Sequence, residues 1–323
     1  MNQDINIFVS NRIDLNSIRV DNPIYIPVYC GAVYKDKFAD NFFMRDDTGD
    51  NISKKRNSYC EFTVQYWAWK NVVSEYYGLC HYRRYLSFSS RMYPVDMLGQ
   101  VVENFLDYGT KQKYKLLDSD YMRSVIKQYD AVVNKAVNIT DVPTPNGKQM
   151  TVYGHWAAHD KVFIDKRTLP ILLDTIQKEF PDYFQAANEY LYGKWHRGYN
   201  CYIMKADLFN AMCDFQFRIL SIIEDILYNS DYIGKCERTM GYLGEILYGI
   251  YIHYLERQDK YKIKELQMVY FEETEEITVI DKIIKYILFT FKHVLESVGY
   301  MTLPKASKRR NFVKKCYFKL LGK

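Results

Sequence analysis

The densest group of reactive side chains in the sequence is His81-Tyr82-Arg83-Arg84, which follows the apolar segment Tyr77–Cys80. Guanidinium groups bind phosphate oxygens bidentately, and such cations stabilise the negative charge that a departing nucleoside diphosphate acquires. If one strand continues through these residues, alternation places His81 and Arg83 on one face and Arg84 on the other. The alternative is a surface strand whose arginines pair with acidic neighbours, because most charged surface clusters are solvated ion pairs.

A carboxylate pair in an Asp-x-Asp pattern could hold a divalent cation on a diphosphate, because Mg²⁺ and Mn²⁺ prefer carboxylate oxygen. Asp118-Ser119-Asp120 fits this pattern. It opens a predicted helix, however, so we expect an N-cap at this position. The sequence therefore predicts no firm metal site or cofactor, and Mn²⁺ or Mg²⁺ at Asp118 and Asp120 is the alternative.

Group transfer to a hydroxyl also needs a base that accepts the hydroxyl proton. Glu245 is the candidate. On the predicted helix it lies on a different face from a row of apolar residues and on the same side as Arg238. The alternative is a partly exposed ion-pair residue, since spacing does not determine burial.

Two further sets of side chains have a structural interpretation. His155 and His159 stand four residues apart and could share a helix face, but zinc needs at least three protein ligands and only Asp160 lies nearby. We therefore interpret both histidines as structural. Trp67 and Trp69 are expected in the core rather than as platforms for sugar rings.

The elements that must position these residues alternate between strand and helix. Short β-branched and aromatic segments predict strands at 5–9, 23–29, 76–88, 129–133 and 199–204. Helical periodicity is found at 62–73, 169–178, 208–227 and 243–254. This alternation favours an α/β layered fold, in which ligand groups lie at the carboxyl ends of strands.

The segment before the first predicted helix contains two local signals. Asp46–Asn51 has the composition of a turn, because Gly and Asn tolerate positive φ and Asp bonds its own backbone. Ser58-x-x-Glu61 matches a capping box, which alone would explain Glu61.

Composition excludes several classes of protein. At 323 residues the chain can bury a substantial core, and its seven cysteines are scattered and never spaced as Cys-x-x-Cys, so neither a disulfide framework nor a zinc ribbon is indicated. The N-terminus lacks the features of a secretory signal, and no stretch of about 18 apolar residues predicts a membrane span. We expect a cytoplasmic protein.

The C-terminal segment differs in charge from the rest. Residues 281–323 carry eleven Lys and Arg against Asp281 and Glu296, a net charge of +9, which leaves about −4 for the remainder. Apolar residues at 283–289 precede a basic cluster that consists of Lys305, Lys308, Arg309, Arg310, Lys314 and Lys315. Such a segment can lie on an anionic leaflet. The alternative is a docked helix followed by a solvated basic tail.

Several segments occur in an order that is typical of one family: 47-DTGDNIS-53, 57-NSYCEFT-63, 66-YWAWKN-71, 78-GLCHYRRY-85, 199-YNCYIM-204 and 238-RTMGYLGE-245. Together they resemble the capsular and exopolysaccharide biosynthesis family long catalogued as a bacterial domain of unknown function, whose members are similar to glycosyltransferases of the A-type fold. The resemblance covers roughly residues 5–260. The sequence departs from the family pattern at Ser10-Asn11, where His-Lys is usual, and at Cys201, where Met is usual.

The resemblance implies an A-type, Rossmann-like α/β fold with a single catalytic domain, which we place at 1–270. The composition described above adds an amphipathic, basic C-terminal segment at 271–323. It implies a hexosyltransferase at the inner face of the cell membrane, which moves a hexosyl group, galactofuranosyl being one candidate, from a UDP-sugar to a lipid-linked oligosaccharide in surface polysaccharide synthesis. His81 and Arg83 would stabilise the diphosphate without a metal ion, and Glu245 would act as the base. The implied donor-binding residues are His81, Arg83, Arg84, Asn200, Arg238, Asn51 and Glu61, although Asn200 could equally cap a turn.

Two other classes remain as alternatives. A non-catalytic scaffold of a polysaccharide assembly complex would fit the missing Asp-x-Asp strand, and slow donor hydrolysis would count against it. A nucleic-acid-binding protein would show steeply salt-dependent binding. The sequence has no aromatic RNA-binding signature or recognition-helix motif, so nucleic acid is not an expected partner.

Overall fold

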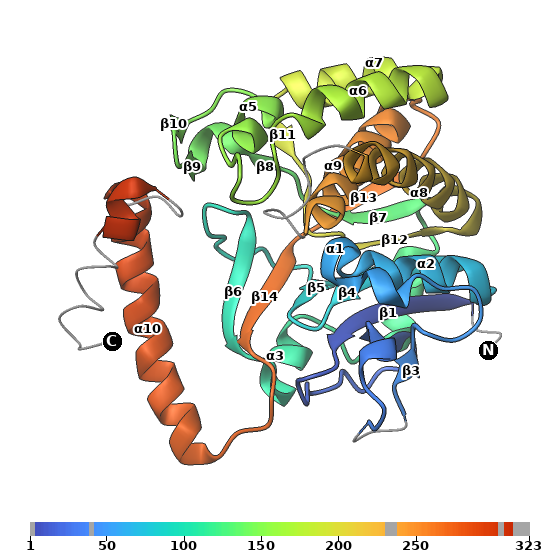
Figure 1. The fold of residues 1–323 in the computed structure, drawn as a ribbon. Helices are drawn as coiled ribbons and strands as arrows, with labels where there is room; N and C mark the ends of the chain where they lie inside the picture. The colour runs from blue at the N-terminus through green and yellow to red at the C-terminus, as the bar shows by residue number, and fades with distance from the viewer. Residues whose placement is uncertain (1–3, 39–41, 230–237, 303–306, 313–323) are drawn as a thin grey trace.

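A ten-stranded mixed sheet organises the chain (Figure 1). The computed structural model describes residues 4–38, 42–229, 238–302 and 307–312. Seven strands follow the order β13-β7-β12-β4-β1-β2-β3: β13 (Ile263–Leu266), β7 (Ala131–Asn134), β12 (Tyr202–Lys205), β4 (Tyr76–His81), β1 (Ile5–Arg12), β2 (Tyr25–Cys30) and β3 (Met44–Arg45). β1 is parallel to β2 and β4, whereas β12 runs antiparallel between β4 and β7.

Three further strands extend the sheet beyond the carboxyl end of β4. They are β5 (Arg84–Leu86), β6 (Gln100–Phe105) and β14 (Met268–Glu273). β14 pairs with both β5 and β6, and β5 is connected to β4. Two small two-stranded sheets lie outside this system: β8 (Val137–Asn138) with β11 (Trp195–His196), and β9 (Pro143–Thr144) with β10 (Gly147–Lys148).

Both faces of the sheet are covered, and the pattern of β1 shows why. Ile5, Ile7 and Val9 belong to one buried cluster, whereas Phe8 belongs to the other. Successive side chains of a strand point to opposite faces, so a continuous apolar run produces a strand that is buried on both sides. The predicted α/β layered fold is therefore confirmed.

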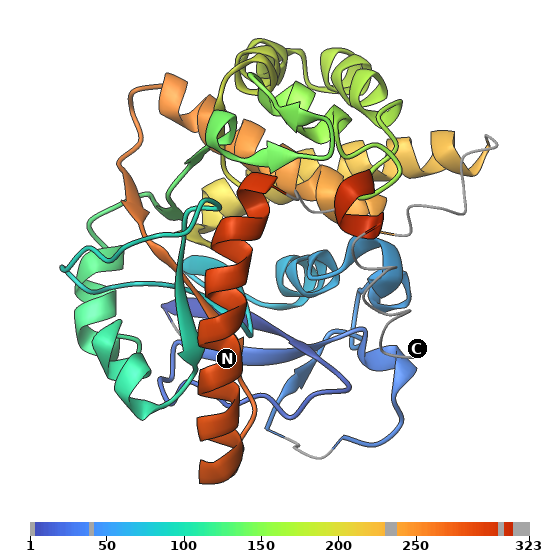
Figure 2. The ribbon, with the colours of Figure 1, turned by 90° about the vertical axis from the view of Figure 1, so that its left-hand side faces the viewer.

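More helices pack on one face of the sheet than on the other. The larger cluster contains residues of α2 (Phe62–Asn71), α5 (Val152–Ala157), α6 (Thr168–Glu179), α7 (Pro181–Tyr192), α8 (Ala206–Tyr228) and α9 (Thr239–Arg257), and the short α1 (Arg56–Tyr59) contacts α9. The opposite face carries α3 (Tyr108–Lys113) and α4 (Ser119–Ile126). Figures 1 and 2 show α6 and α7 as the layer farthest from the sheet. Trp67, expected in the core, is only 3% exposed.

The strand predicted at 76–88 is interrupted. β4 ends at His81, the chain turns at Tyr82-Arg83, and β5 begins at Arg84, so that His81 and Arg84 are antiparallel partners. The turn is stabilised from both sides, because β5 pairs with β14 and the Tyr82 amide donates to the Ser10 carbonyl. The prediction of one continuous strand is wrong.

The predicted capping box is also wrong. Ser58 lies within α1, and Cys60 adopts a positive φ of 52°, which separates α1 from α2. Glu61 then occupies the N-cap position of α2 without a side-chain capping hydrogen bond, which frees its carboxylate for another role. In contrast, Asp118 caps α4 as predicted, because its Oδ1 accepts the Tyr121 amide at 3.1 Å.

Asp46 organises the loops next to the sheet. Its carboxylate is fully buried and accepts the backbone amides of Gly31 and Ala32 at 2.8 and 2.9 Å, and the hydroxyls of Ser53 and Thr63 at 2.6 Å each. One side chain therefore connects the end of β2, the predicted turn at 46–51 and α2.

The last helix lies beside β6 (Figures 1 and 2). The C-terminal segment was predicted to begin at residue 271, and this boundary falls inside β14. α10 (Val279–Thr302) follows, and it is attached by the ion pairs Lys282–Asp107 and Lys285–Glu273 and by contact of the Phe289 and Phe105 rings. In the described parts of the chain, no helix has both the length and the apolar character that a membrane crossing needs.

Candidate active site

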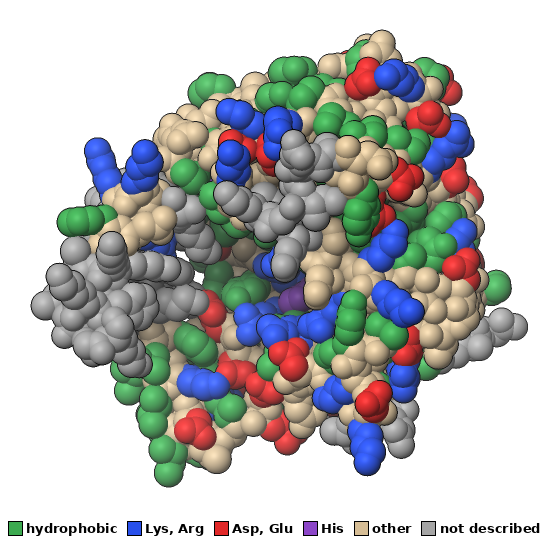
Figure 3. All heavy atoms as spheres, in the orientation of Figure 1, with side chains coloured by type: hydrophobic (Ala, Val, Ile, Leu, Met, Phe, Trp, Pro, Cys, Tyr) green, Lys and Arg blue, Asp and Glu red, His purple; other side chains and the backbone are tan. Residues whose placement is uncertain are grey.

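A cavity of about 740 Å³ opens where the carboxyl end of β4 meets the β5–β6–β14 extension and helices α5 and α9. Its size is typical of small-molecule sites, which measure roughly 300–1,000 Å³. Figure 3 shows it as a hollow in which Lys and Arg side chains and a histidine are visible. Three of its lining residues are cationic, Arg84, Lys135 and Arg238, and four are carboxylates, Glu61, Asp96, Glu245 and Glu272.

His81 and Arg84 line the cavity together, whereas Arg83 does not. The turn at Tyr82-Arg83 makes His81 and Arg84 cross-strand neighbours and directs Arg83 elsewhere, where its Nη1 donates to the Tyr270 hydroxyl at 3.4 Å. The expectation that His81 and Arg83 share a strand face is therefore wrong, because the strand ends at His81.

His81 is a neutral hydrogen-bond donor in a positive environment. The pKa of its imidazole lies well below the ordinary 6.5, first because the ring is buried and then because Arg84, Arg83 and two further arginines surround it. The Arg83 amide donates to Nδ1 at 3.3 Å, so the single proton of the neutral ring is on Nε2.

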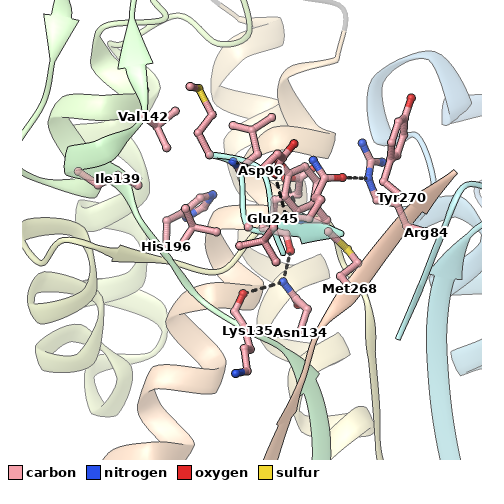
Figure 4. Close-up of a pocket in the computed structure, with 18 of the residues that line it drawn as sticks. Arg84, Asp96, Asn134, Lys135, Ile139, Val142, His196, Glu245, Met268 and Tyr270 are labelled. Atoms are coloured by element: carbon pink, nitrogen blue, oxygen red, sulfur yellow. Dashed lines mark hydrogen bonds between the residues drawn. The ribbon is translucent and has the colours of Figure 1, made fainter. Parts of the chain in front are cut away.

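Two guanidinium groups in the cavity have no carboxylate partner in the described residues. Arg84 lies over the rings of Tyr199 and Tyr270, at 4.7 and 5.3 Å, and its Nε donates to Gln100 Oε1 at 3.2 Å (Figure 4). Arg238 lies over the Tyr242 ring, and its Nε donates to the Cys60 sulfur at 3.1 Å. None of the salt bridges in the described part of the chain includes either residue, so both cations are available to an anionic ligand.

Glu245 lies near the start of α9 with its carboxylate toward the cavity (Figure 4). Its Oε2 accepts the Tyr199 amide at 3.2 Å. Burial, and secondly the negative charge of Glu61, raise the pKa of Glu245 to about 7, although Arg84 and Arg238 oppose the shift. A carboxyl group with this pKa can accept a proton near neutral pH.

The backbone before β12 positions two of the predicted residues, Asn200 and Glu245. Tyr199 and Asn200 both have positive φ, 73° and 45°, and this reversal directs the Tyr199 amide to Glu245. Asn200 is buried, with 1% exposure, and its Nδ2 donates to Glu61 Oε1 at 3.1 Å. Glu61 lines the cavity, and Asn200 contacts the carboxylate of Glu61.

Other predicted residues lie elsewhere. Asn51 is outside the cavity and holds its own loop, since it donates to the Gly49 carbonyl and accepts the Ser53 amide. Asp118 and Asp120 also do not line it. His155 and His159, interpreted as structural, do line it, and the residues that the structure describes contain no group of three His, Cys, Asp or Glu that could hold a metal ion.

The opposite wall was not predicted from the sequence. His196 of β11 and Trp156 of α5 have ring centroids 5.6 Å apart, and Tyr242 of α9 lies 5.7 Å from Trp156. Asp96 and Lys135 also line the cavity without having been identified. These residues are scattered between positions 96 and 242 and form no motif, so only the folded chain brings them together.

The fold is an α/β fold of the glycosyltransferase A type. A structure of WbbM, a bifunctional glycosyltransferase in its apo form, superimposes with a TM-score of 0.75 and 25% sequence identity over 86% of this chain and 48% of that one. The present chain thus spans about half the length of WbbM.

The family model described as domain of unknown function (DUF4422) matches residues 12–259, and the chain belongs to this family. This confirms the resemblance to a glycosyltransferase-like family at the level of the domain. No curated protein matches this sequence significantly.

Proposed function

We propose that this protein is a glycosyltransferase that moves a hexosyl group from a UDP-sugar to a lipid-linked oligosaccharide in surface polysaccharide synthesis. The similarity to a glycosyltransferase structure supports the class of reaction. One observation carries the proposal: two arginines that have no carboxylate partner among the residues the structure describes share a cavity with a carboxyl group whose pKa is about 7. Galactofuranose is the donor sugar that the family resemblance favours.

The arginine side of the cavity would bind the diphosphate. Arg84 and Arg238 supply the positive charge, and His81 adds a neutral Nε2–H donor next to them. When the bond between the anomeric carbon and the phosphate oxygen breaks, the oxygen keeps the electron pair, and fixed cations stabilise the resulting charge. Arg83 acts through Tyr270, which lines the cavity, as a positioning residue.

Glu245 would be the catalytic base. Its ionised carboxylate takes the proton from the acceptor hydroxyl as the hydroxyl oxygen bonds to the anomeric carbon. The Tyr199 amide fixes Oε2, and the Asn200–Glu61 hydrogen bond fixes the second carboxylate that raises the pKa of Glu245. Asn200 and Glu61 are therefore positioning residues in this mechanism, and a donor contact of Asn51 stays a prediction.

The membrane contact would be made by α10, whose orientation is the reverse of that of an ordinary docked helix. Its charged residues Lys282 and Lys285 face the protein, where they pair with Asp107 and Glu273. Its apolar residues face solvent, with 71% exposure for Ile280, 59% for Ile283, 50% for Ile284, 63% for Ile287 and 57% for Leu288. The spacing of these five residues forms one continuous helical stripe.

An anionic leaflet is the occupant that the charge favours. Lys308, Arg309 and Phe312 are exposed beyond the helix, and the segment from residue 281 onward has a net charge of +9. Each basic residue near such a surface contributes about 1 kcal/mol, and buried apolar area adds to this. Lys305, Lys314 and Lys315 of the predicted basic cluster lie outside the described residues.

Calorimetric titration with UDP, with and without Mn²⁺, tests the proposal. Wild-type protein should bind UDP equally well with Mn²⁺ and with EDTA, because the arginines rather than a metal ion would stabilise the diphosphate. Arg84→Gln should weaken binding, and Arg218→Gln, which removes a surface arginine paired with Glu179, should not. Absence of UDP binding in the wild type would sink the proposal in favour of a scaffold role, and a requirement for Mn²⁺ would contradict the metal-independent mechanism.

A further inference from the structure

The two walls of the cavity differ in chemistry. Arg84 and Tyr270 lie on one side, His196, Ile139 and Val142 lie on the other, and Glu245 is between them (Figure 4). The first wall suits a diphosphate. The second presents the uncharged His196 ring and the apolar side chains of Ile139 and Val142, so it suits a ligand with hydroxyl groups and apolar faces.

The hydrogen bonds around His196 favour one tautomer of its ring. The Arg197 amide donates to the Tyr190 hydroxyl at 3.0 Å, and this hydroxyl is 2.7 Å from His196 Nδ1. Because the hydroxyl oxygen accepts from the amide, its own proton is available to Nδ1, and the proton of the neutral imidazole is on Nε2. Burial, and secondly Arg197, lower the pKa of His196 to about 4, so the ring is neutral at pH 7.

Gly198 brings the donor of His196 and the acceptor of Glu245 to one place. A Cβ at position 198 would be 3.0 Å from His196 Nε2 and 3.1 Å from Glu245 Oε2. His196 Nε2 and Glu245 Oε2 therefore both lie against Gly198, close to each other at the wall of the cavity. A sugar hydroxyl matches this pair, because its oxygen accepts one hydrogen bond while its proton is donated in another.

Aromatic rings continue this wall beyond His196, as far as Tyr242, over whose ring Arg238 lies. Trp156 lies edge-on to His196, Tyr242 is 5.7 Å from Trp156, and Phe163 is 5.1 Å from Tyr242. All of them line the cavity. Amphipathic rings of this kind offer apolar surface to the C–H faces of a sugar.

We propose that His196, Trp156 and Tyr242 form the subsite for the acceptor sugar. His196 Nε2–H donates to the oxygen of the reacting hydroxyl, and Glu245 accepts its proton. The oxygen lone pair then forms the bond to the anomeric carbon, and the bond from that carbon to the diphosphate breaks. This assignment rests on the glycosyltransferase function proposed above.

Saturation-transfer NMR on the UDP-saturated protein tests the subsite, with octyl β-glucopyranoside, octyl β-galactopyranoside and octyl β-galactofuranoside as probes. At least one probe should bind the wild type. His196→Phe should raise the Kd of that probe about tenfold and change the Kd of UDP by less than twofold. His196→Gln, which keeps an N–H donor, should recover part of the affinity. His253→Gln, a histidine paired with Glu189 and Glu256 outside the cavity, is the matched control.

Two variants separate this inference from the general function. Tyr190→Phe should weaken probe binding while UDP binding persists, because it removes the hydroxyl that fixes the tautomer of His196. Arg84→Gln should show the reverse, with UDP affected more than the probe. If no probe binds the wild type, or if His196→Phe leaves probe affinity unchanged or weakens UDP equally, the subsite is refuted even though UDP binding upholds the function. Loss of UDP binding in the wild type refutes both.

Discussion

His81, the last residue of β4, and Arg84, the first residue of β5, are partners across the turn formed by Tyr82 and Arg83. The turn makes the two residues cross-strand partners, so a neutral imidazole and an arginine line the same cavity. β14 holds the arrangement, because Phe271 donates its amide to the Arg83 carbonyl.

Arg84→Lys should weaken UDP binding even though the charge is retained. Lysine cannot form the bidentate contact or stack between Tyr199 and Tyr270 as the planar guanidinium does. The loss of one charge-assisted hydrogen bond corresponds to about 1.5–3 kcal/mol, or roughly 10- to 100-fold in Kd. Calorimetry with UDP measures this, and equal affinity in the lysine variant would show that a point charge is sufficient.

Glu245→Gln should reduce the rate of transfer by about 10²- to 10⁴-fold, the usual contribution of a general base. In the wild type, kcat/KM should rise with pH through about 7, because the carboxyl group with its raised pKa is protonated and inactive below that value. The variant should lose this rising limb. A coupled assay of UDP release between pH 5.5 and 9 measures both, and an unchanged pH profile in the variant would assign the base to another residue.

Replacement of Ile283 and Ile287 together by Asp should reduce co-sedimentation with vesicles that contain phosphatidylglycerol. Both side chains are exposed, so the folded body should be unaffected, whereas two charges in the apolar stripe oppose insertion among acyl chains. Val73→Asp, at a position that is 77% exposed beyond α2, is the control for a charge placed on another surface. Equal binding by wild type and double variant would remove α10 from the membrane contact.

Asp46→Ala should lower the free energy of unfolding by about 3 kcal/mol or more, since each buried donor without a partner costs roughly 1–3 kcal/mol. The variant leaves the amides of Gly31 and Ala32 and two hydroxyls without this acceptor. Asp47→Ala breaks a pair with the half-exposed Arg45, and it should cost about 1 kcal/mol or less. Urea unfolding compares the two, and similar costs would contradict the role given to Asp46.

The layered fold could be predicted because its strands are short apolar runs with clear ends. The turn after His81 could not, because Tyr82-Arg83 contains none of the residues that favour turns, and only pairing with β14 makes the chain reverse there. The capping box was predicted wrongly for a related reason. Ser58-x-x-Glu61 satisfies a local pattern, but the positive φ of Cys60 breaks the helix between the two residues.

The wall of the cavity that contains His196 shows a different limit. His196 carries no motif, and its tautomer depends on Tyr190 of α7 and on a backbone amide. Gly198 permits the approach of His196 to Glu245. These contacts lie between residues of α7, β11 and α9. No periodicity in a single sequence predicts contacts between elements so far apart.

The outward stripe of α10 has a consequence for how the protein would meet the proposed lipid-linked acceptor. If the stripe lies on a leaflet as proposed, the protein and the proposed lipid-linked acceptor would diffuse in the same plane, and their encounter would depend on membrane area rather than on cell volume. Confinement of this kind raises effective concentration without any new contact in the active site. The proposed acceptor subsite would then be able to bind its sugar weakly and release the product quickly, while the protein stays on the leaflet.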